Sequence, residues 1–452
     1  MDEIKNDTSD ILPNELPSQS SERNICPKDS IRYENSLIVS KKILGYGSHG
    51  TIVFQGKYYN RDVAVKRLLL DFYDVASHEI TLLQESNDHP NIVRYFCKQE
   101  SKKFLYIALE LCSASLYDVI EKSSLYPELV NQMTSKNTLY QIANGVSYLH
   151  SLKMVHRDIK PQNILVAPPR KNRISYSSYY HYNEHSSPVR ILVTDFGVSK
   201  KLDIDQSSFG PTSALPVGTS GWMAPELLTS DNTRPRGTRA IDIFSLGCVF
   251  YYVLSGGSHP FGEEYDRNGN IIRNKVSFRN LDLLAYDYSE CVDLINRMIA
   301  HKPKDRPDIT DVLTHPYFWT SSQRLEFLVK LSDRMDSEIK DPPSPLIKSF
   351  ESQSRKIVGK DWHTRFEKIF VNEIERQRKY RGERILDLLR AMRNKSHHYD
   401  NLPENIMALV GPLPDGYLAY FTRKFPLLFM HGYYFVKKNL QEEEGFASFF
   451  QL

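Results

Sequence analysis

The sequence predicts an α+β chain, in which a two-lobed domain of strands and helices is followed by an all-helical domain. Short β-branched runs and helical segments alternate as far as HPYFW at residues 315–319. After that point the apolar residues recur with helical periodicity only, interrupted by DPPSP at 341–345. We therefore place a domain boundary between residues 319 and 320.

The composition is typical of soluble globular protein in a reducing compartment. The chain has 452 residues, of which 40% are hydrophobic and 25% are charged. Its five cysteines form no CxxC pair, which argues against a disulfide framework and against a zinc ribbon. No apolar run approaches the ~18–20 residues of a membrane span, and the acidic start does not resemble a signal peptide. Because the formal net charge is only +3, any nucleic-acid-binding surface is expected to be a local patch.

Two segments have the composition of polypeptide that buries little apolar surface. Residues 1–35 are rich in Asp, Glu, Asn, Ser and Pro, and we predict a disordered linker there. APPRKNRISYSSYYHYNEHSSP, at 167–188, interrupts a strand-like region and is expected to be a surface insertion. A docking role for this insertion stays open.

The first chemical signal is a glycine pattern near the start of the first domain. GYGSHGTIV places Gly45, Gly47 and Gly50 at GxGxxG spacing. Alone the pattern is weak, because dinucleotide-binding folds share it. Here, however, VAVK ends at Lys66 in strand-like sequence, where a dinucleotide fold would enter a helix.

Three further motifs follow in order and complete the pattern. HRDIKPQN contains Asp158, Lys160 and Asn163, TDFG contains Asp195, and MAPE ends at Glu226. Together the motifs resemble the protein-kinase family over roughly residues 39–320. The resemblance implies a bilobal protein kinase fold at 36–319, with an N-lobe at 36–112 and a C-lobe at 113–319.

The resemblance also implies roles in phosphoryl transfer from ATP, with ADP as the product and Mg²⁺ as the metal. Asp158 is expected to accept the proton of the attacking hydroxyl, and Lys160 beside it matches the serine/threonine kinases. Asn163 and Asp195 would supply oxygen ligands to Mg²⁺. The residues expected to bind the nucleotide are Gly45, Gly47, Gly50, Val53, Lys66, Glu79, Glu110, Cys112, Asn163 and Asp195.

Three of these expectations concern partners. We expect Glu79, on the segment DVASHEITLLQ, to orient Lys66, with a surface ion pair as the alternative. Glu110 and Cys112 fall where the family's hinge offers backbone groups to adenine. Two further family positions, Asp242 and Arg306, are expected to be scaffold, and Arg306 is expected to pair with Glu226.

The loop between Asp195 and Glu226 carries the hydroxyls of Ser207, Ser208 and Thr212. Serines are common in loops, which is the simple interpretation. The functional hypothesis is autophosphorylation, because a phosphate there would pair with Arg157 and order the segment.

A basic run lies beyond the kinase-like region. Residues 376–398 contain eight Lys or Arg against two acids. Such a run is typical of phosphate-backbone binding, although many charge runs are only solvated faces. Upstream, Leu325, Leu328, Leu331 and Met335 define an apolar helix face that we expect to pack on the C-lobe.

Periodicity within the basic run sharpens the functional hypothesis. The spacing predicts one buried helix face, formed by Ile385, Leu388, Leu389 and Met392. The opposite face would carry Arg390, Arg393, Asn394 and His397. His398 would lie one turn beyond Asn394. Imidazole, amide and guanidinium groups on one solvent-facing surface could cleave RNA without a metal. The alternative is that His397 and His398 cap the helix or pack beside Tyr399.

Two longer motifs carry a second resemblance. With LLRAMRNKSHHYDNLP and YFTRKFP, residues 320–452 closely resemble the kinase-extension nuclease domain of the Ire-type (inositol-requiring) sensors and of ribonuclease L. No ankyrin-like repeats precede the kinase motifs, so the Ire type is the nearer match. The fold implied is an all-helical kinase-extension nuclease domain.

By this resemblance the catalytic positions are Tyr380, Arg393, Asn394 and His398. His398 is the general acid, Tyr380 the candidate base, Arg393 the phosphate clamp and Asn394 an orienting contact. The implied products are a 2′,3′-cyclic phosphate and a 5′-hydroxyl, formed without a metal.

The resemblance further implies stem-loop mRNA as substrate, the chain itself as the kinase substrate, and a homodimer or higher oligomer formed through both domains. It also implies the cytosolic face of the endoplasmic reticulum, with membrane attachment only through a missing upstream transmembrane segment. The alternative is a Ser/Thr kinase whose C-terminal domain is a non-catalytic docking or dimerisation module.

Overall fold

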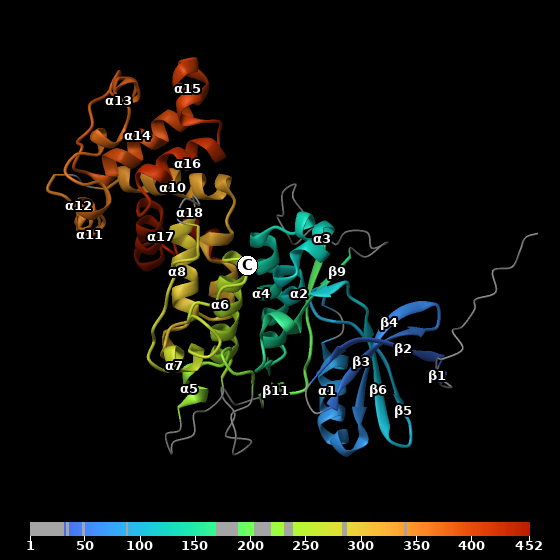
Figure 1. The fold of residues 1–452 in the computed structure, drawn as a ribbon. Coiled ribbons are helices and arrows are strands. Elements are labelled where there is room, and N and C mark those ends of the chain that lie inside the picture. Colours follow the sequence, from blue (N-terminus) through green and yellow to red (C-terminus); the bar gives the residue numbers. More distant parts are fainter. Residues whose placement is uncertain are drawn as a thin grey trace, which may run out of the picture.

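The computed structural model describes residues 31–32, 36–47, 50–86, 89–168, 189–202, 218–229, 238–282, 287–338 and 341–452. It confirms the predicted fold class, with a sheet-containing lobe, a helical lobe and a helical domain following one another along the chain (Figure 1). Most of the predicted linker and insertion lies outside the described residues, and so do Ser207, Ser208 and Thr212. No helix of the described part is both long and apolar enough to cross a membrane.

The first lobe is built on an antiparallel six-stranded sheet in the order β1-β2-β3-β4-β6-β5. The strands are β1 (Ile31–Arg32), β2 (Leu37–Tyr46), β3 (Ile52–Tyr58), β4 (Arg61–Leu69), β5 (Tyr95–Glu100) and β6 (Phe104–Glu110). Side chains alternate between two cores, since Tyr106 and Ala108 pack on one face of β6 while Leu105 and Ile107 pack on the other. Helix α1 (Tyr73–Glu85) contributes Ile80 to the second core.

The second lobe is mainly helical. Its helices are α2 (Leu116–Glu121), α3 (Pro127–Gln132), α4 (Ser135–Ser151), α5 (Pro225–Leu228), α6 (Ala240–Leu254), α7 (Arg267–Ile272), α8 (Tyr288–Met298) and α9 (Ile309–Leu313). Two small sheets are formed by β7 (Ala114–Ser115), β8 (Met154–Val155), β9 (Ile164–Ala167), β10 (Arg190–Val193) and β11 (Lys200–Lys201), paired as β10-β9-β7 and β11-β8.

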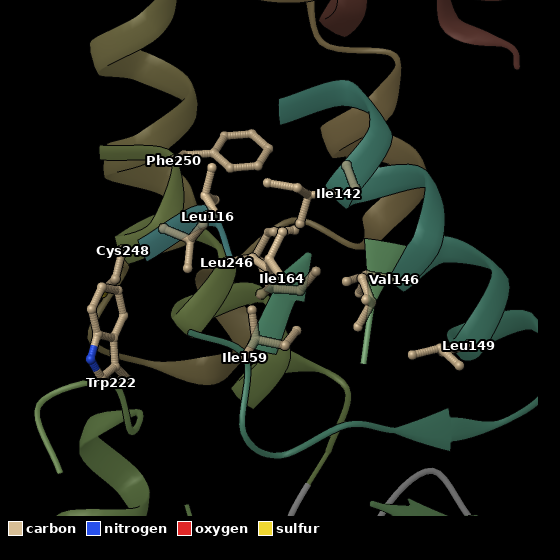
Figure 2. Packing of buried hydrophobic residues seen from close by; sticks show 14 of the residues in the cluster. Leu116, Ile142, Val146, Leu149, Ile159, Ile164, Trp222, Leu246, Cys248 and Phe250 are labelled. Atoms are coloured by element: carbon tan, nitrogen blue, oxygen red, sulfur yellow. The ribbon is translucent and has the colours of Figure 1, made fainter. Parts of the chain in front are cut away.

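Helix α6 forms the centre of this lobe because it is apolar on nearly every side. Its side chains pack against those of α2 and α4, among them Leu116, Ile142 and Phe250 (Figure 2). This core continues into the first lobe through Leu68 and Leu109, so the two lobes share buried apolar surface. The shared core therefore fixes the position of one lobe relative to the other.

The helical domain has a separate core. Its helices are α10 (Ser321–Asp336), α11 (Pro345–Glu351), α12 (Ser354–Ile357), α13 (Lys368–Ile374), α14 (Ile385–His397), α15 (Glu404–Val410), α16 (Asp415–Lys424), α17 (Leu428–Asn439) and α18 (Glu444–Ala447). The core includes Trp319, which precedes the predicted boundary. The apolar face predicted for 385–392 is buried there, as the periodicity requires.

One packing expectation was wrong. The apolar face of α10, with Leu328, Leu331 and Met335, packs into the core of the helical domain and not onto the C-lobe. The physical reason is that α14 and α17 cover this face with their own apolar side chains. The C-lobe instead contacts α10 near its first turn.

That contact is a buried ion pair. Arg324 Nη1 donates to Glu290 Oε1 on α8 at 3.0 Å, and each side chain is only 2% exposed. Arg324 Nη2 also donates to the carbonyl of Pro316 at 3.0 Å. The chain end returns to the same place, where the ring of Phe449 lies 5.1 Å from that of Trp319. The charge pair between Arg324 and Glu290 joins the helical domain to the C-lobe.

We predict that Arg324→Met lowers the free energy of unfolding by about 3–5 kcal/mol, because it leaves the Glu290 carboxylate buried without its cation. Urea denaturation followed by circular dichroism measures the loss. Lys330→Met, at a side chain on the same helix that is 40% exposed, should change stability by less than about 0.5 kcal/mol. The double variant Arg324→Met/Glu290→Met should recover most of the loss, and a double variant as unstable as the single one would contradict the pairing argument.

Candidate active sites

The first cluster of charged groups lies where β4 faces α1. Lys66 Nζ donates to Glu79 Oε1 at 2.6 Å and to Asp195 Oδ1 at 2.9 Å. The predicted contact between Lys66 and Glu79 is present, and Glu79 is buried, so the alternative of a surface ion pair does not apply. Strand β4 alternates Val63 and Val65 into the sheet core, which directs Lys66 to the opposite side.

The charges in this cluster stabilise one another. The Lys66 ammonium, together with hydrogen bonding, lowers the pKa of Asp195 to about 2 against the effect of burial. Burial alone would lower the pKa of Lys66, but the carboxylates of Glu79 and Asp195 raise it above its usual value. Asp195 also has a positive φ of 67°, a strained conformation that is common at functional sites. Lysine and aspartate are therefore both charged at neutral pH.

A second cluster surrounds Asp158. Its Oδ2 accepts from Lys160 Nζ at 2.7 Å and from Asn163 Nδ2 at 2.9 Å. Its Oδ1 accepts from Thr219 Oγ1 at 2.6 Å, and Lys160 also donates to Thr219 at 2.5 Å. The sequence motifs did not single out Thr219, because a threonine in the loop before MAPE has no distinctive spacing. The carboxylate of Asp158 is thus fixed by three side chains.

Buried scaffold contacts hold the loop that carries Asp158 and the segment that contains Glu226. Asp242 accepts from the backbone N–H groups of His156 and Arg157, both at 2.8 Å. Arg306 donates to both carboxylate oxygens of Glu226, at 2.8 and 2.7 Å, as expected from the sequence. Each arrangement joins segments that lie far apart in the sequence.

The glycine-rich turn leaves room for a ligand. Among the residues that the structure describes, a Cβ at Gly45 or Gly50 would meet no atom within 4 Å, and Gly50 has a φ of +74° that other residues rarely adopt. Gly45 pairs with Val53 across the two strands. Backbone beside open space fits the cradling of phosphates, whose oxygens accept hydrogen bonds from N–H groups.

At the hinge, the backbone N–H of Glu110 is already occupied. The N–H of Glu110 donates to the carbonyl of Arg94 at 2.8 Å, and its side chain pairs with Arg190. Its carbonyl is contacted by the Cys112 thiol, with sulfur and oxygen 3.7 Å apart. Burial raises the pKa of Cys112 to about 12, so the thiol is neutral. The carbonyl of Glu110 is the group of this residue that could meet an adenine.

The donor atoms near Asp195 fit Mg²⁺. Because Asn163 Nδ2 donates to both the carbonyl and the carboxylate of Asp158, its amide oxygen is the atom that can face a cation. One carboxylate and one amide oxygen are the hard donors that Mg²⁺ prefers. Among the described residues no group of three or more His, Cys, Asp or Glu could hold a metal ion. A cation here would therefore need additional oxygens from phosphate and water.

In the helical domain, α14 carries the other predicted constellation. Asn394 Nδ2 donates to Tyr380 Oη at 3.0 Å, and Arg393 donates to Asn394 Oδ1 through Nη2 at 3.1 Å and Nε at 3.3 Å. His398 follows the helix directly, and its backbone N–H donates to the Asn394 carbonyl at 3.2 Å. The side chains of Arg393, Asn394 and Tyr380 are thus linked in series by hydrogen bonds. The exposed fourth residue, His398, lies one helical turn after Asn394.

The expectation that Arg390 lies on the solvent face was wrong. Its side chain is only 8% exposed. Nε donates to Asp336 Oδ1 at 2.9 Å, and Nη1 donates to Asp387 Oδ1 at 2.9 Å. Periodicity does not distinguish an exposed arginine from one that is buried with two carboxylates.

Most of the basic run is likewise paired. The contacts are Lys379–Glu375 at 2.8 Å, Arg381–Glu383 at 2.6 Å, Lys395–Glu373 at 2.8 Å and Arg384–Glu351 at 3.7 Å. Arg378 lies over the Tyr380 ring, 5.8 Å from its centroid. Three acids outside the run, Glu375, Glu373 and Glu351, offset part of its charge, so the run is less cationic in the fold than in the sequence.

Glu351, the last residue of α11, was missed by the sequence analysis. Its carboxylate accepts from the backbone N–H groups of Ile385 and Leu386, both at 3.0 Å, and so caps the N-terminus of α14. No side chain local to α14 provides this cap. A cap donated from 34 residues away leaves no local sequence signal.

We predict that Glu351→Ala lowers the free energy of unfolding of the helical domain by about 1–2 kcal/mol, because it exposes two N–H groups and removes a charge that favours the helix N-terminus. Thermal unfolding followed by circular dichroism tests this. Glu442→Ala, at an exposed acid, is the matched control with an expected change below about 0.5 kcal/mol. Equal melting temperatures for the two variants would show that the cap contributes nothing.

Comparison with known families gives two matches. The protein kinase domain matches residues 38–318, and ribonuclease 2-5A matches residues 324–450. These spans lie inside the predicted domains at 36–319 and 320–452.

Curated proteins match across both regions. The chain is 46% identical over 92% of its length to the sensor for unfolded proteins in the ER ire1 of Schizosaccharomyces pombe. It is 39% identical over 91% of its length to the serine/threonine-protein kinase/endoribonuclease IRE2 of Homo sapiens, and 35% identical over 92% to IRE1a of Arabidopsis thaliana. The matched regions are 39%, 43% and 50% of those proteins, so the chain spans at most about half the length of these relatives.

Proposed function

The chain belongs to the protein kinase family and has the kinase/ribonuclease organisation of the Ire-type proteins, and on this premise we propose that it is a bifunctional enzyme. One activity is an ATP- and Mg²⁺-dependent Ser/Thr kinase that phosphorylates another copy of the chain. The other is a metal-independent endoribonuclease that cleaves stem-loop mRNA. The observation that carries the nuclease half is the hydrogen-bonded chain from Arg393 through Asn394 to Tyr380.

The kinase half uses groups that are already fixed. Asp158 accepts the proton as the substrate hydroxyl oxygen bonds to the γ-phosphorus, and ADP leaves with the electrons of the broken P–O bond. Lys160 offsets charge beside that oxygen, and Lys66, oriented by Glu79, holds the α- and β-phosphates. Asp195 and Asn163 would hold Mg²⁺, which when bound neutralises phosphate charge.

The proposed phosphorylation sites are Ser207, Ser208 and Thr212. A phosphate there would carry nearly two negative charges at neutral pH and would pair with Arg157. Arg157 lies beside the base Asp158 in sequence, and its backbone N–H is held by Asp242. A phosphate on this loop would thus bind an arginine that is adjacent in sequence to the proposed catalytic base.

The nuclease half follows from four groups. Tyr380 takes up or directs the proton of the 2′-hydroxyl while that oxygen attacks the adjacent phosphorus. Arg393 and Asn394 stabilise the charge of the pentacoordinate phosphorane. His398 protonates the departing 5′ oxygen, so that one product ends in a 2′,3′-cyclic phosphate and the other begins with a 5′-hydroxyl.

The competing proposal is a kinase with a non-catalytic docking or dimerisation module. Compensation of the basic run by nearby acids favours it, because little net charge then remains for RNA. Against it stands the link between a buried phenol and the Asn394 amide, which has no evident use in docking. The nuclease proposal therefore remains the better supported one.

The proposed setting is the cytosolic face of the endoplasmic reticulum, where an upstream transmembrane segment would attach the protein. The name of the Schizosaccharomyces pombe relative, a sensor for unfolded proteins in the ER, supports this setting. The proposed partners are stem-loop RNA and a second copy of the chain, contacted through both domains.

The first functional prediction is that His398→Ala abolishes cleavage of a stem-loop RNA while ATP binding is kept. The leaving oxygen then lacks its proton donor, whereas the nucleotide groups lie in the other domain. Cleavage is followed on gels with end-labelled RNA, and ATP binding by fluorescence with a nucleotide analogue. His397→Ala, at the neighbouring exposed histidine, should cleave nearly as fast as the unmodified protein.

The same assay in EDTA separates the two proposals. A cyclising mechanism without a metal survives chelation, whereas a docking module cleaves in neither buffer.

Unchanged cleavage by His398→Ala would falsify the assignment of the general acid.

A second functional prediction concerns association. If nucleotide binding and loop phosphorylation favour a dimer, RNA cleavage per protomer should rise steeply with protein concentration, because a ligand shifts such an equilibrium only through its different affinities for the two states. Initial rates are measured from nanomolar to micromolar protein with and without ADP. A constant rate per protomer across that range would rule out activation by association.

A further inference from the structure

One carboxylate lies between two arginines of the nuclease helix. Asp336, the last residue of α10, accepts from Arg390 Nε at 2.9 Å and from Arg393 Nη1 at 2.8 Å. The two helices lie side by side (Figure 1). Arg390 is nearly buried, whereas Arg393 belongs to the proposed catalytic set. Asp336 therefore joins the interior of the domain to the candidate active site.

The contacts continue into a closed circuit. From Asp336 the path runs through Arg390 to Asp387 Oδ1, and Asp387 Oδ2 accepts the backbone N–H of Arg381 at 2.7 Å. Arg381 follows Tyr380 directly. The circuit closes from Tyr380 through Asn394 and Arg393 back to Asp336. The side chains of Arg393 and Asn394 are thus each held from two sides.

Burial identifies the part of the circuit that fixes geometry. Arg393 has a second carboxylate partner, Asp333 at 2.7 Å, but that side chain is 55% exposed, against 26% for Asp336. Exposed ion pairs contribute little orientation, because water competes for both charges. The buried charge of Arg390 in turn restrains Asp336, since an unpaired guanidinium there would be costly.

We propose that Asp336 is a positioning residue of the nuclease, which sets the orientation of the Arg393 guanidinium toward the scissile phosphate. This inference rests on the proposed ribonuclease function and extends it to a residue outside the RNKSHH motif. Asp336 does not touch RNA in this scheme. It acts through Arg393, while Arg390 and Asp387 keep its carboxylate in place.

The decisive measurement is a double-mutant cycle on RNA cleavage by the full chain. Asp336→Asn should lower kcat about 10–100-fold, the range typical of lost supporting contacts, and should change KM by less than about threefold. In an Arg393→Lys background the same substitution should lower kcat by less than about threefold, because the group through which it acts is already altered. Glu326→Gln, an exposed acid on the same helix, should leave both constants unchanged.

Asp336→Glu distinguishes a loss of positioning from a loss of folding. It keeps the negative charge, so its melting temperature should stay close to that of the unmodified chain, and its kcat should lie between that chain and Asp336→Asn. A normal kcat for both Asp336 variants overturns the proposal, and so does an equal loss of kcat in both Arg393 backgrounds. If the unmodified chain does not cleave RNA, the ribonuclease function itself fails, and this inference fails with it.

Discussion

The structure depends on charges that are buried only in pairs. Removing one ionised group from water costs several kcal/mol, and a partner in good geometry must offset that cost. Lys66 with Glu79, Arg324 with Glu290, and Arg390 with Asp336 each join two separate elements of the fold. Such pairs fix the relative position of their elements more sharply than apolar contacts, which tolerate small shifts. In each domain a proposed catalytic group lies next to one of these pairs.

The two sites use the same chemistry in different surroundings. In the kinase-like domain, Lys66 stands between two carboxylates beside an open glycine turn, so an arriving phosphate meets a fixed cation. In the helical domain Arg393 is likewise shared between two carboxylates. An RNA phosphate bound there, as we propose, would have to compete with these contacts or add to them. In both sites the orientation of the cationic side chain is fixed before a ligand binds. Because its carboxylate partners offset its charge, each site attracts an anion less strongly.

The sequence was informative where function depends on local spacing. The kinase motifs, the helix position of Glu79 and the buried face at 385–392 could all be predicted, because each follows from neighbouring residues or from a 3.6-residue period. Thr219, Glu351 and Asp336 could not, since their partners lie 34 or more residues away. The placement of Arg390 failed for a related reason, because a hydropathy pattern treats every arginine as exposed. Local order was therefore predictable, whereas long-range pairing of polar groups was predictable only where family motifs mark both partners, as for Arg306 and Glu226.

The place of Trp319 affects how this protein can be divided into fragments. Its ring packs with Phe327, Phe429 and Phe449, so it belongs to the helical domain. In the sequence, however, it is the last residue of HPYFW, the motif that ends the kinase-like domain. A fragment starting at residue 320 would lack that ring and open a hole among aromatic side chains. A fragment ending at 319 would carry an indole without its aromatic neighbours. The two halves overlap by one side chain, and neither is complete when the chain is cut at the motif boundary.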